Sequence, residues 1–127
     1  MEKVQVKQAR TKAELRQAYA IRRAVFIEEQ KIAENEEWDG LDDTALHFIA
    51  LDGKQVTGTA RVRLLSPESA KIERMAVLKP FRRKGVGKSI IGFVEKYLTA
   101  RDIRDVFLHA QVTAIPFYHA CGYEESI

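Results

Sequence analysis

One continuous stretch, from Lys71 to Leu98, constrains the fold more than any other part of the chain. Its first part contains Ile72 and the apolar run from Met75 to Leu78, which predicts a strand. A polar loop around Pro80 follows, and the basic run RRKGVG then leads into a segment with apolar residues at helical spacing. That apolar stripe comprises Ile90, Ile91, Val94, Tyr97 and Leu98. The stretch therefore predicts a strand, a basic glycine-containing loop and an amphipathic helix in direct succession.

The junction between this loop and the helix is suited to binding a phosphate group. The N–H groups of a first helical turn have no partner within the helix, and the helix dipole adds partial positive charge there. Gly85 and Gly87 carry no Cβ, so that a phosphate oxygen can approach the backbone closely. Formal charge around them comes from four cations: Arg82, Arg83, Lys84 and Lys88. We predict a ligand that carries phosphate.

Two familiar nucleotide motifs are incomplete at this loop. Gly87-Lys88-Ser89 has the form of the end of a P-loop, but the first glycine of that motif would fall on Arg82. The third glycine of a dinucleotide fingerprint would fall on Ile90. A nucleotide-binding protein is therefore a weakened alternative, and we expect the loop to work without a metal ion.

Length and composition exclude several classes of protein. A chain of 127 residues is expected to form a single domain, 1–127, with one core. The net charge of +3 comes without a basic stripe bearing exposed aromatics, which argues against nucleic acid as a partner. No apolar run approaches the roughly 18 residues of a membrane span. A single cysteine, Cys121, excludes an internal disulfide and suits a reducing compartment, so we expect a cytoplasmic protein.

The segment before the strand has a helix and then an acidic stretch. Thr11 and Glu14 form a capping box, which opens a helix whose apolar stripe also carries Arg22. Of two interpretations of Arg22, a snorkelling stem is favoured over a structural ion pair. The acidic stretch QKIAENEEWDGLDD (30–43) is either a solvated face or a surface that attracts a cationic substrate, and Trp38 within it is a core plug or a substrate wall.

Two further strands precede Lys71. LHFIALD and QVTGTARVRLL are joined at Asp52-Gly53, a strong signal for a tight turn. Gly58 within the second of these strands predicts a bulge or a close backbone approach. Arg61 and Arg63 lie on one face of the same strand and face either solvent or substrate.

The loop and a second region resemble the GCN5-related N-acetyltransferase (GNAT) family. R-x-x-G-x-G is matched by Arg82, Gly85 and Gly87, and the segment 115–123 resembles the family's A-x-x-F-Y-x-x-x-G-[FY]. The segment RRAVF at 22–26, followed by Glu29-Gln30, is similar to the small bacterial ElaA/YjcF-like branch. The resemblance implies an α/β, GNAT-like fold with a mixed central sheet flanked by helices, in the order β-α-β-β-β-loop-α-β-α. Family members usually continue through two more strands, which here are short or absent.

The family resemblance also implies a function and assigns residues to it. It implies an N-acetyltransferase that moves an acetyl group from acetyl-CoA to a primary amine of a small molecule or peptide. The alternative is a non-catalytic acyl-CoA-binding or interaction module with the same fold. The central strand would bind the pantetheine arm, the loop the pyrophosphate, and Tyr118 would be the acid that protonates the departing thiolate; otherwise Tyr118 is a packed aromatic. The expected CoA-binding residues are Met75, Ala76, Val77, Arg82, Arg83, Lys84, Gly85, Val86, Gly87, Lys88 and Phe117.

Acetyl transfer requires a neutral amine, and this requirement points to a base. A lysine-like amine with a pKa near 10.4 is neutral in only about one molecule in 2,500 at pH 7, a deficit of roughly 4.6 kcal/mol. A general base or a water chain must therefore remove the proton, and backbone N–H donors on a splayed strand can stabilise the tetrahedral oxyanion. Glu73 is the first candidate base, although it could instead pair with Arg61 or Arg63 across the hairpin. His109 and His47 are the second and third candidates.

The last segments predict an unfinished sheet. DVFLHAQ (105–111) predicts a fifth strand whose apolar residues on both faces indicate an interior position. Tyr123 can only begin a sixth strand before the chain ends at Ile127. Because an apolar strand edge without a partner favours association, we expect either self-association, for example as a homodimer, or marginal stability.

Overall fold

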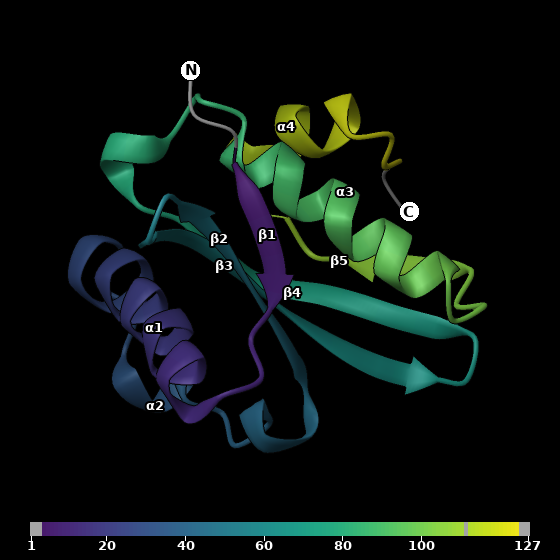
Figure 1. Ribbon diagram of the computed structural model, residues 1–127, viewed down its shortest axis with the longest axis horizontal. Helices are drawn as coiled ribbons and strands as arrows, with labels where there is room; N and C mark the ends of the chain where they lie inside the picture. Colours follow the sequence, from purple (N-terminus) through teal and green to yellow (C-terminus); the bar gives the residue numbers. More distant parts are fainter. Residues whose placement is uncertain (1–3, 111, 125–127) are drawn as a thin grey trace.

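The computed structural model describes residues 4–110 and 112–124, which form one mixed sheet between two layers of helix (Figure 1). The strand order is β1-β2-β3-β4-β5; neighbours from β1 to β4 are antiparallel, and β4 and β5 are parallel. The strands are β1 (Gln5–Gln8), β2 (Leu46–Asp52), β3 (Gln55–Ser66), β4 (Ser69–Val77) and β5 (Asp105–Leu108). This arrangement confirms the predicted α/β class.

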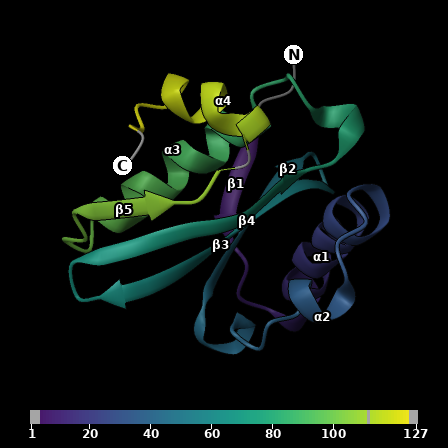
Figure 2. The same cartoon turned by 180° about the vertical axis from the view of Figure 1, so that it is seen from behind.

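Helices cover both faces of the sheet. One face carries α1 (Lys12–Arg22) and the other carries α3 (Val86–Thr99), as the two opposite views show (Figures 1 and 2). The helix α1 continues as a π-helical segment, Arg23–Glu29, and α2 (Glu34–Glu37) follows it. The helix α4 is Ile115–Ala120. Short 3₁₀ turns lie at Asp42–Thr44, Lys79–Phe81 and Val112–Ala114. No helix in the described ranges is long and apolar enough to cross a membrane.

The helix starts follow from local sequence. The Thr11 hydroxyl accepts from the Glu14 N–H, and the Glu14 carboxylate accepts from the Thr11 N–H, which confirms the predicted capping box. The stripe predicted for α3 is also confirmed, because Ile90, Val94 and Leu98 are each fully buried. The β2–β3 hairpin turns at Gly53, which has a φ of 61°, as the Asp52-Gly53 pair predicts.

The sheet is buried on both sides, and this explains the apolar runs in its strands. In β2, Phe48 and Ala50 pack in the core beneath α3, whereas Ile49 packs in the core beneath α1. Gly58 in β3 is tightly enclosed, because a Cβ there would lie 3.1 Å from the Ala76 carbonyl oxygen and from an Ile90 methyl group. The close backbone approach predicted at Gly58 is therefore confirmed.

A bulge in β4 decides which of its side chains face α3. Glu73 is opposite Arg61 and Ala76 is opposite Thr59, so Arg74 and Met75 together face only one residue of β3. Arg74 adopts a φ of 54°, a left-handed conformation that is costly for a residue with a side chain. Because one extra residue reverses the alternation of faces, Met75 and Val77 pack on the α3 side and Ala76 on the α1 side.

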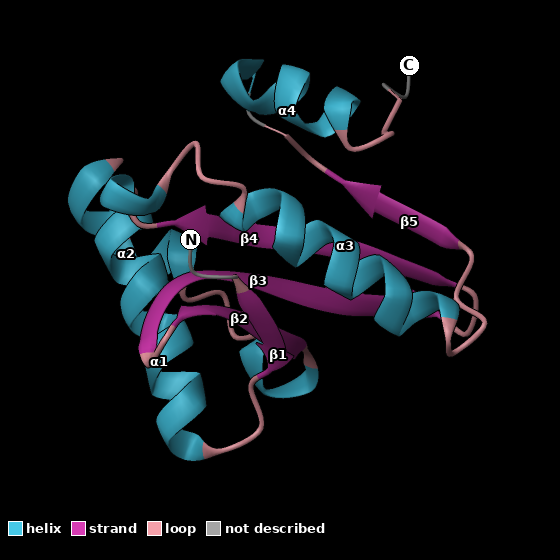
Figure 3. Cartoon of the chain, turned by 45° about the horizontal axis from the view of Figure 1, so that its top comes forward, coloured by secondary structure: helices cyan, strands magenta, loops and turns pink. Residues whose placement is uncertain are grey.

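β4 and β5 separate halfway along β4. Their pairing runs only from Ser69 opposite Asp105 to Ile72 opposite Leu108. Beyond Ile72, β4 continues to Val77, whereas β5 ends at Leu108 and the chain that follows it leads away to α4 (Figure 3). The backbone of β4 past the bulge therefore faces a gap rather than a paired strand, within the described part of the chain.

The prediction that the fifth strand is interior is wrong for the described sheet. Among the described strands β5 is an edge strand that pairs with β4 alone, and its Phe107 side chain is 52% exposed. Only alternate residues, Val106 and Leu108, pack against the core, which is why apolar residues on both faces were a misleading signal. Tyr123 and Glu124 are not in a strand, and residues 125–127 of the predicted sixth strand lie outside the described residues. Self-association stays a prediction, which light scattering across a concentration series tests.

Candidate active site

The loop between β4 and α3 has the tight turn and the uncapped helix start on which the predicted phosphate site depends. Arg83 and Gly85 have φ values of 64° and 83°, and this turn allows α3 to begin at Val86 without a side-chain cap. A hollow of about 560 Å³, here called the α3 pocket, extends from this helix start. Ten of the thirteen predicted site residues line it: Met75, Val77, Arg82, Arg83, Gly85, Val86, Gly87, Lys88, Phe117 and Tyr118.

Gly87 and Phe117 bring the helix start and α4 into contact. A Cβ on Gly87 would lie 3.0 Å from the Phe117 Cζ atom, so any side chain there must displace the ring. The Phe117 ring is 36% exposed and lines the α3 pocket. The glycine of the loop and the aromatic residue of the second motif, thirty residues apart, therefore form one wall of the pocket.

Arg82 is held by protein groups in a way that the sequence did not indicate. Its Nε donates to the Val77 carbonyl oxygen at 2.8 Å, and its two Nη atoms donate to the Glu29 carboxylate at 2.7 and 2.6 Å. The Arg82 guanidinium in turn holds the pKa of Glu29 below its usual value. Arg82 thus ties the end of β4 to the π-helical segment. Among the cations that line the α3 pocket, Arg83 and Lys88 have no such clamp within the described residues.

Two expected CoA-binding residues lie outside the α3 pocket. Ala76 is 3% exposed and packs in the core beneath α1, so only its backbone is available to a ligand. Lys84 does not line the pocket; its Nζ lies 5.9 Å from the centroid of the Phe81 ring.

A second hollow, here called the β4–β5 pocket, opens where the two strands separate. It has a volume of about 280 Å³ and lies between the π-helical segment, β4 and the residues after β5. Met75, Ala114 and Tyr118 line both this pocket and the α3 pocket. The two pockets therefore meet at the β4 bulge and at the Tyr118 side chain.

Tyr118 lies between the two pockets, where its hydroxyl group could donate a proton to a bound ligand. Its ring packs edge-on against Phe117 and Tyr123, with centroid distances of 5.0 and 6.3 Å. Burial, assisted by the nearby Cys121 thiol, raises the pKa of Tyr118 above its ordinary value of 10.0. The phenol is therefore protonated at neutral pH, which leaves it able to donate a proton or a hydrogen bond.

Glu73 is paired with Arg61 and Arg63 across the hairpin, which was the alternative to its role as a base. Its carboxylate accepts from Arg63 Nε at 2.9 Å and from Arg63 Nη2 at 3.0 Å, and it also accepts from Arg61. Lys71 Nζ lies 3.4 Å from the same carboxylate. Burial opposes ionisation, but the two guanidinium groups outweigh it and lower the pKa of Glu73 to about 2. A carboxylate with this pKa is a poor proton acceptor at pH 7, so the geometry argues against Glu73 as the base.

The preference for a snorkelling Arg22 is wrong. Arg22 is 1% exposed, and its guanidinium donates to Glu37 at 2.7 Å and to Asp42 at 2.7 Å. It also lies 4.8 Å from the centroid of the Trp38 ring. The ion pair forms because the stripe of α1 that carries Arg22 faces the acidic stretch, so that burial of the guanidinium is compensated by carboxylates.

The acidic stretch is divided between counterions of buried arginines and exposed carboxylates. Arg61 is 1% exposed and makes a two-pronged pair with Asp39, with both distances 2.8 Å, and also contacts Asp42. Glu37 is 2% exposed and is paired with Arg22. Of the acidic residues of this stretch, Glu34, Glu36 and Asp43 are exposed, as a solvated face requires, whereas Glu37, Asp39 and Asp42 are counterions of arginines in α1 and β3.

The two candidate histidines have different surroundings. His47 is 3% exposed, its Nε2 donates to the Asp42 carbonyl oxygen at 2.9 Å, and burial lowers its pKa. It does not line the β4–β5 pocket. His109 is exposed and lines that pocket together with Met75 and Tyr118.

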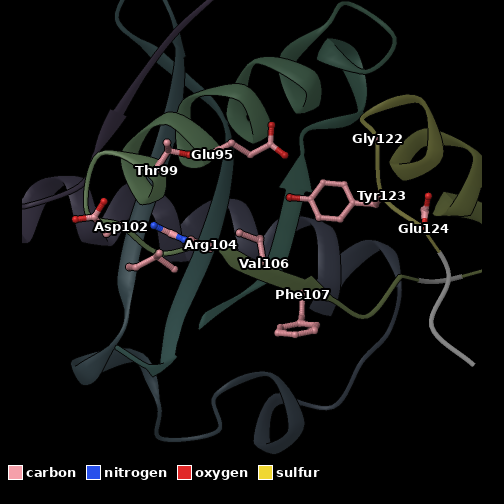
Figure 4. Close-up of a pocket in the computed structure, with 10 residues that line it drawn as sticks. Glu95, Thr99, Asp102, Arg104, Val106, Phe107, Gly122, Tyr123 and Glu124 are labelled. Atoms are coloured by element: carbon pink, nitrogen blue, oxygen red, sulfur yellow. The ribbon is translucent and has the colours of Figure 1, made fainter. Parts of the chain in front are cut away.

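A hollow larger than the α3 and β4–β5 pockets lies away from the predicted site residues. It has a volume of about 1040 Å³ and lies beside β5, between the end of α3 and Tyr123 (Figure 4). Glu95, Phe107 and Tyr123 are among its lining residues, and none of the predicted site residues lines it. We therefore place the candidate active site at the α3 and β4–β5 pockets, where the predicted residues converge.

Comparison with known proteins identifies the class. The model of the acetyltransferase (GNAT) family matches residues 13–123. The protein YyaT of Bacillus subtilis is 37% identical over 95% of this chain and 83% of its own length. The N-acetyltransferase YjcF of the same organism is 35% identical over 91% of this chain and 81% of its own length. The crystal structure of Escherichia coli ElaA has the same fold, with a TM-score of 0.79 and 24% identity over 99% of this chain and 94% of that one.

The chain therefore belongs to the GNAT acetyltransferase family. The family, the fold and the likeness to YjcF and ElaA confirm the resemblance drawn from the two motifs.

Sequence reasoning missed three residues that shape the site. Glu29 clamps Arg82, Arg74 carries the strained conformation of the bulge, and Lys71 lines the β4–β5 pocket. Glu29 lies beside Gln30 in the segment that matched the bacterial branch, which was an available signal. Neither Arg74 nor Lys71 has a comparable signal. A bulge such as that at Arg74 is visible only once the strands are paired, and the pocket that Lys71 lines is visible only in the folded chain.

Proposed function

We propose that the chain is an acetyl-CoA-dependent N-acetyltransferase that acetylates a primary amine by direct attack on the thioester. One observation carries the proposal: the α3 pocket, which contains the predicted phosphate-binding loop, meets the β4–β5 pocket at Met75 and Tyr118. A donor in the first pocket and an acceptor in the second would therefore bring their reacting ends together. Such positioning contributes much of the rate of a two-substrate transfer.

The residues of the α3 pocket fit a CoA-like ligand. The uncapped start of α3 and the cations Arg83 and Lys88 suit the pyrophosphate. The segment from Met75 to Val77 lies past the point where β4 pairs with β5, so its backbone, apart from the Val77 carbonyl that Arg82 occupies, is available to the amide groups of the pantetheine arm. The same unpaired backbone offers N–H donors for the oxyanion of the tetrahedral intermediate. These assignments agree with those that the family motifs imply.

Tyr118 is proposed as the group that donates to the departing thiolate, because it lines both pockets and stays protonated. Tyr118→Phe is expected to lower kcat by about 10²-fold, the low end for loss of a positioned general acid. Acetyl-CoA affinity should change little, since the ring that packs on Phe117 is retained. Steady-state rates and calorimetric titration measure the two effects. Tyr97→Phe, on α3 outside both pockets, is the matched control; equal rates for both variants would assign Tyr118 a packing role.

His109 is proposed as the base, directly or through water. It is exposed and lines the β4–β5 pocket, whereas Glu73 is held by two arginines and His47 is buried away from both pockets. His109→Gln is expected to lower kcat by about 10²-fold. His119→Gln, on α4 outside the β4–β5 pocket, should leave kcat unchanged. An unchanged kcat in His109→Gln would mean that a water chain, and not His109, removes the proton.

Consumption of acetyl-CoA across a panel of primary amines tests the proposed function. Release of free CoA thiol that depends on an added amine supports the transferase. A non-catalytic acyl-CoA-binding module would instead show thermal stabilisation by acetyl-CoA with no thiol release in the presence of any amine. That outcome would replace the transferase with the binding module.

A further inference from the structure

We infer that the acceptor is a small primary amine that also carries a carboxylate several bonds away, and that Lys71 binds this carboxylate. The inference rests on the proposed function, because it names the substrate class for the β4–β5 pocket. It depends on the charges of that pocket, on its size and on the position of Lys71 along β4.

The carboxylates that line the pocket are already engaged by cations of the protein. Glu37 accepts from Arg22 Nε on one oxygen, and its other oxygen lies 3.2 Å from Arg74 Nε. Both oxygens of Glu73 are contacted, by Arg63 on each and also by Arg61 on one. Their side chains are only 2% and 9% exposed. A second ammonium or guanidinium group of an acceptor would find no unoccupied carboxylate at these two positions.

The ionic cluster behind the pocket has an excess of positive charge. Its contacts join five cations to four carboxylates: Arg22, Arg61, Arg63, Lys71 and Arg74, with Glu37, Asp39, Asp42 and Glu73. Because Arg22, Arg61 and Glu37 at its centre are buried, this imbalance is screened less than it would be in water. The pocket wall therefore favours an anionic group on the ligand.

Lys71 is the cation best able to receive that group. Its side chain is 21% exposed and lines the β4–β5 pocket, and the contact described for its ammonium group is the 3.4 Å pair with Glu73. An ammonium group has three donors, and Glu73 is held independently by two arginines. Arg74, the other cation of the wall, is turned toward the Glu36 carbonyl oxygen and Asp39. Lys71 can thus bind a ligand carboxylate without giving up a contact on which the fold depends.

The geometry also limits the size and length of the acceptor. A volume of about 280 Å³ is below the range typical of drug-sized ligands. Phe26, Ile32 and Ile72 supply an apolar wall for the body of the molecule. Lys71 precedes Met75 by four residues, which span at most about 13 Å at 3.3 Å per residue, because the bulge at Arg74 shortens the rise. An amine at Met75 and a carboxylate at Lys71 are therefore separated by a chain of several bonds, as in an ω-amino acid.

Three probes of equal length test this acceptor class: ω-aminohexanoate, hexylamine and hexamethylenediamine. They differ only in whether the end opposite the reacting amine is anionic, neutral or cationic. We expect kcat/KM to be about 10- to 100-fold higher for ω-aminohexanoate than for hexylamine, the value of one charge-assisted hydrogen bond. Hexamethylenediamine should be the poorest of the three. Equal values for the three amines, or a preference for the diamine, would overturn the inference.

A Lys71 variant tests whether this residue confers the preference. Lys71→Met keeps the length of the side chain and should bring the ratio of kcat/KM for ω-aminohexanoate to that for hexylamine, both measured on the variant, down to about 1. Lys54→Met, in the exposed β2–β3 turn, is the matched control and should retain the preference. A preference that survives in Lys71→Met would assign the carboxylate to another residue and overturn the inference as stated.

Calorimetric titration with acetyl-CoA separates this inference from the proposed function. Acetyl-CoA binding together with equal turnover of the three amines contradicts the acceptor class and leaves the transferase intact. Acetyl-CoA binding without turnover of any of the three contradicts the acceptor class, and it contradicts the transferase as well only if no amine of the wider panel releases CoA thiol.

Discussion

Gly87→Trp is expected to abolish the binding of acetyl-CoA while leaving the fold intact. A Cβ at this position already lies 3.0 Å from the Phe117 ring, so an indole must push the ring away and fill the mouth of the α3 pocket. The wild-type chain should gain about 2.7 kcal/mol of stability at a ligand concentration of 100 Kd, and the variant should gain none. Thermal unfolding with and without acetyl-CoA measures this difference.

Gly92→Trp provides the control for Gly87→Trp. Gly92 lies in the same helix, and a Cβ there has no heavy atom within 4 Å. The same substitution therefore adds the same side chain to α3 without touching the pocket, and stabilisation by acetyl-CoA should persist. If Gly87→Trp were stabilised by acetyl-CoA as strongly as Gly92→Trp, the phosphate cradle at the start of α3 would be the wrong site.

Arg22→Met is expected to cost about 3–5 kcal/mol in the free energy of unfolding, which is a large part of the stability of a domain of this size. The substitution removes the guanidinium that donates to Glu37 and Asp42, and Glu37 remains 2% exposed with its negative charge. A buried carboxylate that has lost its main partner is the costly element, more than the lost pair itself. Urea unfolding at neutral pH measures the change.

The neighbouring residue supplies the matched control for Arg22→Met. Arg23 also lies over the Trp38 ring, at 5.7 Å, but its partner Glu34 is 62% exposed and Arg23 itself is 45% exposed. Arg23→Met should therefore cost less than about 1 kcal/mol. In Arg22→Met combined with Glu37→Leu, part of the loss should be regained because the unpaired charge is gone. Equal small costs for the two single variants would mean that the buried cluster contributes little.

The α3 pocket could be predicted from the sequence because its parts are nearly contiguous. A strand, a loop with Gly85 and Gly87, and an amphipathic helix follow one another, and each forms for local reasons. The second motif predicted that Phe117 belongs to the same site, and the structure places its ring beside Gly87. Structure that depends on neighbouring residues does not require long-range pairing, and the strand, the helix and their junction all lie where the sequence predicts them.

The β4–β5 pocket could not be predicted in the same way, because its walls depend on pairing over long distances in the chain. Arg22 and Arg61 share Asp42, although the three residues belong to α1, β3 and the segment between α2 and β2. The charges of residues 34–43 were visible in the sequence, but their partners were not. The bulge at Arg74 reversed the faces of Met75 and Val77, and no alternation pattern announces such an insertion.

Transfer of a labelled acetyl group tests the central claim most directly. The chain is incubated with acetyl-CoA labelled in its acetyl group and with a set of primary amines, and mass spectra of the amines and of the protein are recorded. Direct attack between two adjoining pockets predicts that an amine gains the labelled acetyl group in step with the release of CoA thiol, while the protein carries no label. Acetyl-CoA that binds but leaves every amine unlabelled, or label that stays on the protein alone, would contradict it.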